Sequence, residues 1–119
     1  FVAASLEGWI YCRDYSAKCV EIVLDNGSAL GASHQAWQMN EINGLIWPSP
    51  DGVGMMDADQ WAQTVSVATS ESILAAAPDS AAYTTEYVDA ALASLNGRGM
   101  DTTGKNWQRI SVTLNLGGE

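Results

Sequence analysis

The chain has 119 residues, of which 47% are hydrophobic and five are tryptophans, and this composition predicts one folded domain and not a disordered segment. The 14 acidic and 5 basic residues give a formal net charge of -9, and no basic patch offsets it. Nucleic acid is therefore excluded as an expected partner, because phosphate backbones would be repelled. No apolar run approaches the roughly 18 residues that a membrane-spanning helix needs.

The first twelve residues, FVAASLEGWIYC, predict a helix, because their apolar side chains recur at helical spacing. The expected buried stripe comprises Val2, Leu6, Trp9 and Ile10. The sequence begins at Phe1, and no capping residue, Met start or signal peptide comes before this stripe. We therefore expect the 119 residues to be a piece of a longer protein, in which a binding site shared between two lobes is only partly present.

The two cysteines, Cys12 and Cys19, flank the sequence RDYSAK. In one continuous helix they would lie ~10 Å apart along the axis, too far for a bridge. A turn at residues 14–16, with Ser16 as the N-cap of a second helix, would bring them together. Two interpretations stay open: a disulfide, contributing ~2.5 kcal/mol and typical of exported proteins, or two reduced, half-buried cysteines. A zinc site is not expected, because His34 is the one remaining candidate ligand.

Two further helices are predicted before the loop SPDGVGMM at residues 49–56. One covers residues 17–25 and ends at an Asn-Gly pair, a common C-terminal signal. The other covers residues 30–46, because Pro48 prevents the helix from continuing. The apolar face of this second helix comprises Ala36, Met39, Ile42 and Ile46.

The fourth and fifth helices each begin at a recognisable cap. Asp57 is an N-cap, and Gln60 three residues later completes a capping box. The helix that follows is expected to end at the alanines of residues 75–77, before a proline. The fifth helix follows the Tyr-Thr-Thr of residues 83–85. Its apolar face comprises Val88, Ala91, Leu92 and Leu95.

The C-terminal residues differ in character from the rest of the chain. We expect a helical segment at residues 1–96 and an extension of loop and strand at residues 97–119. Apolar and polar residues alternate over residues 110–116, which predicts a β-strand. Because one strand is not stable alone, it would pair with a sheet from outside these residues or from another chain. The expected fold class is mainly α, with about five helices and one C-terminal strand.

No arrangement of side chains predicts catalysis. His34 is the one histidine, it has no accompanying nucleophile motif, and we expect it on a helix surface. Asp57 and Asp59 are interpreted as a cap and a first-turn acid in preference to a carboxylate pair. The sequence DGVG at residues 51–54 lacks the ligands of a calcium loop and the lysine of a phosphate-binding loop. We therefore expect no enzyme, no catalytic residue, no metal and no cofactor.

Trp47 is the one candidate ligand contact. It follows a helix immediately before Pro48, where an aromatic ring can stack on a flat ligand. The alternative is core or interface packing, the commoner role of tryptophan in helical proteins. Packing is the preferred interpretation for Trp9, Trp61 and Trp107.

Four segments occur in order: LEGW at residues 6–9, VEIVL at 20–24, DADQW at 57–61 and YTTEY at 83–87. Together they resemble the C-terminal part of periplasmic solute-binding proteins of ABC importers. The resemblance spans about residues 1–95 and is strongest to the branch of nitrate, sulfonate, taurine and thiamine-pyrimidine-precursor binders. The cysteine pair and the stretch LIWPSP resemble a subgroup near the vitamin-precursor binders, of the thiamine-pyrimidine or riboflavin type.

The resemblance implies a parent protein with two α/β lobes joined by a hinge. Such proteins close on a small ligand, and a membrane permease of the ABC importer reads the closed form. Residues outside this chain would supply most ligand contacts. The implied location is the periplasm or the cell exterior, with a lipid anchor upstream as one arrangement.

Two other functions compete with this one. A pyrimidine-precursor synthase shares the fold and would need histidines, cysteines and a metal from outside these residues. A free-standing helical interaction domain would be a stable monomer. As a piece of a binding protein, the chain would instead expose apolar faces and form homo-oligomers.

Overall fold

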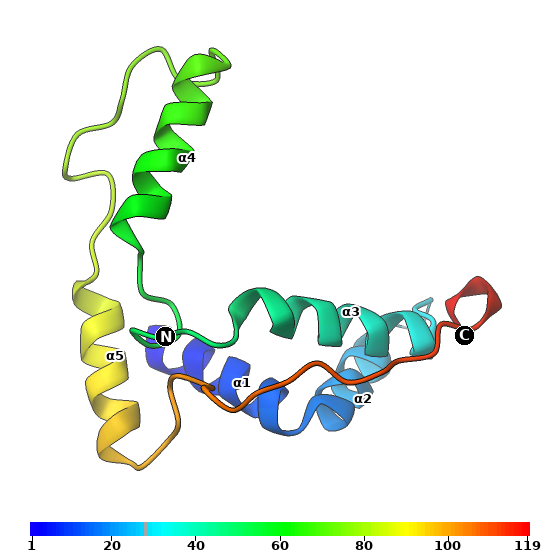
Figure 1. The fold of residues 1–119 in the computed structure, drawn as a ribbon. Helices are drawn as coiled ribbons and strands as arrows, with labels where there is room; N and C mark the ends of the chain where they lie inside the picture. Colours follow the sequence, from blue (N-terminus) through cyan, green and yellow to red (C-terminus); the bar gives the residue numbers. More distant parts are fainter. Residues whose placement is uncertain (28) are drawn as a thin grey trace.

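The protein is built from α-helices in the computed structural model, which describes residues 1–27 and 29–119. The elements in chain order are α1 (Val2–Asp14), α2 (Ser16–Asn26), α3 (Ala32–Ile46), α4 (Ala58–Ser70), α5 (Glu86–Gly97) and a short 3₁₀ turn, η1 (Leu116–Gly118) (Figure 1). No β-strand occurs among the described residues. The expected mainly α class is therefore confirmed, and each of the five helices begins close to its expected start.

A sharp corner at Tyr15 separates α1 from α2, and a disulfide closes it. The Cα atoms of Cys12 and Cys19 are 5.2 Å apart, and their sulfurs are bonded. The disulfide and the turn within residues 14–16 are thus confirmed, in place of two reduced cysteines. Ser16 is the first residue of α2, not its N-cap, and no side-chain cap bond is present there. Phe1 likewise provides none for α1, as the sequence predicts.

The hydrophobic core lies where α1, α5 and the loop after α3 meet. Its buried members are Leu6, Ile10, Trp47, Val53, Ala91, Leu92 and Leu95. The apolar face expected for the fifth helix is confirmed, and Leu95 is completely buried. Trp9 is 38% exposed and lies outside the core, although it belongs to the stripe expected for the first helix. The reason is that the α1 side bearing Leu6 and Ile10 packs against α5.

Helix α4 projects away from the other helices and buries none of its residues (Figure 1). Its predicted N-cap is confirmed, because Asp57 Oδ1 accepts a hydrogen bond from the N–H of Gln60 at 2.8 Å. The Trp61 ring meets the Tyr83 ring edge-on, with 5.0 Å between the ring centres. This contact joins α4 to the segment that returns to α5.

The predicted end of α4 at residues 75–77 is wrong, since the helix ends at Ser70. Ser72 has a positive φ of 58°, and the N–H of Ile73 donates to the carbonyl of Ala68 at 2.9 Å. This is the Schellman arrangement, which satisfies the last carbonyls and stops a helix. Ile73 is 75% exposed, so the apolar residues beyond the stop have no core against which a longer helix could pack.

Replacing Ser72 with glycine should stabilise the end of α4 by about 1 kcal/mol. A side chain at positive φ carries a steric cost that glycine avoids. Amide hydrogen exchange in α4 would measure the effect as slower exchange. Ser70→Gly is the matched control, because a glycine inside the last turn should speed exchange instead. Unchanged or faster exchange in Ser72→Gly would contradict this account of the helix end.

The predicted strand at residues 110–116 does not form. These residues instead run alongside α3 toward its N-terminal end (Figure 1). Asn40 of α3 donates to the carbonyl of Ile110 and accepts from its N–H, each at 3.0 Å, and Ser33 Oγ accepts from the N–H of Asn115. No partner strand is present among the described residues, so helix side chains satisfy these backbone groups. Ile110 is 61% exposed, so the alternation marks no buried face.

Candidate functional site

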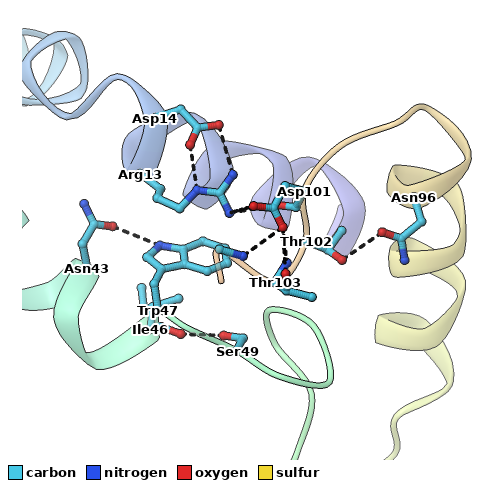
Figure 2. A network of polar contacts seen from close by, with 11 residues as sticks. Arg13, Asp14, Asn43, Ile46, Trp47, Ser49, Asn96, Asp101, Thr102 and Thr103 are labelled. Atoms are coloured by element: carbon cyan, nitrogen blue, oxygen red, sulfur yellow. Dashed lines mark hydrogen bonds and ion pairs between the residues drawn. The ribbon is translucent and has the colours of Figure 1, made fainter. Parts of the chain in front are cut away.

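Trp47 follows the last residue of α3 and is only 3% exposed. Its indole N–H donates to Asn43 Oδ1 at 3.2 Å. The Arg13 guanidinium carbon lies 4.5 Å from the centre of its ring, which is a cation–π contact (Figure 2). Within this chain the ring therefore contacts protein groups, and a direct ligand contact of Trp47 stays a prediction.

Arg13 is a buried cation, and the carboxylates of Asp14 and Asp101 balance its charge. Its Nε and Nη2 donate to the two carboxylate oxygens of Asp14, at 2.7 and 3.1 Å. Its Nη1 donates to the carbonyl of Asp101 at 2.8 Å and lies 3.6 Å from the carboxylate of that residue. In the sequence Arg13 is an isolated basic residue, and its burial follows from a partner 88 positions away.

Asp101 folds residues 101–104 into a tight turn against Trp47. Its Oδ1 accepts three hydrogen bonds: from the Thr103 N–H at 2.9 Å, the Thr103 hydroxyl at 2.8 Å and the Gly104 N–H at 3.0 Å. Aspartate commonly starts turns by bonding the backbone two residues onward, so the sequence DTTG carries a signal for this turn. That signal lies within a segment whose expected structure was simply a loop.

The turn is also connected to α5 and to the loop after α3. The buried Thr102 donates through its hydroxyl to Asn96 Oδ1 at 2.9 Å (Figure 2). The carbonyls of Thr103 and Thr102 accept from the N–H groups of Ser49 and Val53, at 2.8 and 2.9 Å. Arg13 of α1, the loop after α3 and the turn at residues 101–104 therefore meet at Trp47, although they are distant in sequence.

The pKa of Asp101 lies below its ordinary value, chiefly because the hydroxyl of Thr103 donates a hydrogen bond to its carboxylate. The backbone N–H groups of Thr103 and Gly104 and the charge of Arg13 also lower this pKa. A carboxyl with a depressed pKa contributes stability above its ordinary pKa and loses that contribution as pH falls through the folded-state value. Replacing Thr103 with valine should therefore raise the pKa of Asp101 and weaken the pH dependence of stability in the acid range.

An NMR titration of the Asp101 carboxyl carbon would measure this pKa directly. Thr113→Val is the matched control, because Thr113 is exposed and lies outside the turn at residues 101–104. The pKa of Asp101 should not change in that control. An Asp101 pKa that is equal in Thr103→Val and in the unmodified chain would contradict the assigned cause.

Beside this network lies a groove of about 820 Å³ between α1, the loop at residues 48–57 and α4. Its apolar lining residues include Leu6, Trp9, Leu45, Ile46, Val53, Met55, Met56 and Trp61. Among the described residues, Asp51 and Asp57 are its two charged lining residues, and neither lysine nor arginine lines it. Aromatic and thioether side chains with a few polar groups suit a flat apolar or heteroaromatic molecule.

The remaining candidate residues have structural positions. His34 is exposed on α3, with its ring 5.8 Å from the Trp37 ring. Glu41, on the same helix, pairs with Arg109. Asp59 lies in the first turn of α4. Across the described part of the chain, no three His, Cys, Asp or Glu side chains form a group that could hold a metal.

The structure thus defines a mainly α protein whose first corner is closed by a disulfide. No family model matches the chain, and no curated protein or solved structure matches it significantly. Among the described helices, none is both long and apolar enough to cross a membrane.

Proposed function

We propose that the chain is the C-terminal part of an exported solute-binding protein of an ABC importer. The observation that carries the proposal is the Cys12–Cys19 disulfide, which follows the LEGW segment of the resemblance. Disulfides persist in oxidising compartments and are rare in the cytosol. The bridge therefore supports a location in the periplasm or outside the cell.

The distribution of apolar surface also supports the proposal. Helix α4 buries none of its residues, and Leu45 at the C-terminal end of α3 is largely exposed. Large exposed apolar patches usually mark surfaces that another protein segment covers. In the proposed parent protein, the rest of a two-lobed α/β fold would cover them. In the isolated chain, the same surfaces favour homo-oligomers.

The ligand of the parent protein is proposed to be small and heteroaromatic, such as a thiamine pyrimidine precursor or riboflavin. The groove beside α4 supports this ligand class, because Trp9 and Trp61 are among its lining residues. Hinge closure would enclose the ligand, and a permease would then recognise the closed form. The mechanism is binding and release, with no covalent step.

Native mass spectrometry of the full-length gene product, purified from its host, tests this proposal. We expect a co-purifying small molecule with the mass of a pyrimidine precursor or a flavin. Isothermal titration calorimetry should then show that these two compounds bind more tightly than taurine and nitrate. A gene product that stays in the cytosol and binds none of these solutes would refute the proposal.

The same preparation separates the two competing functions. Iron-dependent formation of a pyrimidine product would identify a synthase. A gene product of only these 119 residues that is a stable monomer would identify a free-standing interaction domain. Either outcome would replace the transport function.

A further inference from the structure

A second cavity, separate from the groove beside α4, lies under the C-terminal segment. It has a volume of about 360 Å³ and is bounded by the α1–α2 corner, α3 and the segment from residue 107 to residue 112. Its apolar lining residues are Ala17, Val20, Ala36, Trp107, Ile110 and Val112. Because its walls come from three distant parts of the chain, the cavity exists only when the C-terminal segment is in place.

Specific contacts hold the C-terminal segment over this cavity. Asn40, which is buried, bonds both backbone groups of Ile110. Arg109 forms an ion pair with Glu41 one residue further along α3. The small side chain of Ala36, one turn earlier on α3, leaves space between the helix and the segment that covers it. These contacts hold the C-terminal segment in a defined position over the cavity.

The buried polar side chains around the cavity, those of Arg13, Asn40 and Asn43, already have partners. Arg13 bonds Asp14 and the carbonyl of Asp101. Asn43 is 1% exposed, accepts from Trp47 and donates to a backbone carbonyl of α1 at 3.3 Å. Among the described residues, no buried side-chain nitrogen or oxygen lacks a hydrogen-bond partner. A charged ligand would therefore find no free counter-charge here, whereas a neutral apolar ring would displace only water.

We propose that this cavity binds a small, neutral aromatic molecule, between the Trp107 side chain and the small side chains of Ala17 and Ala36. The volume falls within the range of about 300–1,000 Å³ that is usual for small-molecule pockets. The inference goes beyond the proposed transport function. The ligand of that function would be enclosed between two lobes, whereas residues of this chain alone form the present cavity.

Indole is a suitable probe, and the full chain can be titrated with it by NMR. We expect a dissociation constant below about 1 mM. The amide signals of Val20 and Val112, which line this cavity, should shift. Indole-3-carboxylate should bind at least tenfold more weakly, because Arg13, the cation among the described lining residues, is already paired with Asp14 and Asp101. Absence of binding, or shifts confined to the groove, would overturn the proposal.

Two substitutions test the site itself. Ala36→Leu places a larger side chain in the cavity and should weaken indole binding at least tenfold. Ala32→Leu, the matched control at an exposed position of the same helix, should leave it unchanged. Asn40→Ala removes the roof contacts without filling the cavity and should also weaken binding. Equal affinity in Ala36→Leu and Ala32→Leu, or unchanged affinity in Asn40→Ala, would refute the site.

Discussion

Replacing Trp47 with alanine is expected to lower the free energy of unfolding by about 3–5 kcal/mol. The ring is almost completely buried in the core cluster, so its removal would leave a large cavity. The substitution also leaves Asn43 Oδ1 without its donor and uncovers the face of Arg13. Urea denaturation, followed by far-ultraviolet circular dichroism, would measure the loss.

Trp37→Ala is the matched control for this experiment. Trp37 is 38% exposed on α3, and its described ring contact is with His34. We expect a cost of less than about 1 kcal/mol, because little buried area is lost. Similar costs for the two alanine variants would show that Trp47 does not organise the core.

Replacing Gly104 with alanine is expected to destabilise the fold by about 3 kcal/mol or more. Its φ is 57°, a conformation that costs most residues about 1–2 kcal/mol. A Cβ at this position would also lie 2.5 Å from Cε3 of Trp47 and 3.0 Å from Nη1 of Arg13. Both neighbours are held by other contacts, so the turn itself would have to move away from Trp47.

Gly99→Ala separates the two causes. Gly99 also has a positive φ, of 75°, but a Cβ there would meet no atom within 4 Å. Its substitution should carry only the conformational cost of about 1–2 kcal/mol. If the two alanine variants unfold at the same urea concentration, the close approach of the turn to Trp47 has no energetic role.

Local sequence patterns were sufficient to predict the helices. The apolar spacing of Leu92 and Leu95 identified the buried face of α5, and the Asp57 cap located the start of α4. The cysteine spacing allowed the corner that the structure contains. These features depend on residues within about one or two turns of each other, which is the range that periodicity and capping describe.

The features that sequence patterns missed depend on distant partners. A helix past Ser70 would need a surface to cover Ile73, and none is present among the described residues. A strand at residues 110–116 would need a neighbouring strand, and the side chains of Asn40 and Ser33 on α3 take its place. The burial of Arg13 likewise needs the turn at Asp101, and no local pattern around residue 13 contains that information.

The segment from residue 57 to residue 85, which contains α4, begins and ends at nearly the same place on the core. Gly54, just before the segment, lies beside Val88, just after it. The helix it contains buries nothing of its own. Substitutions along α4 can therefore accumulate without loss of the core that α1 and α5 share. Selection on this segment can therefore act separately from selection on folding, and we expect related sequences to diverge fastest at those of its positions that do not line the groove.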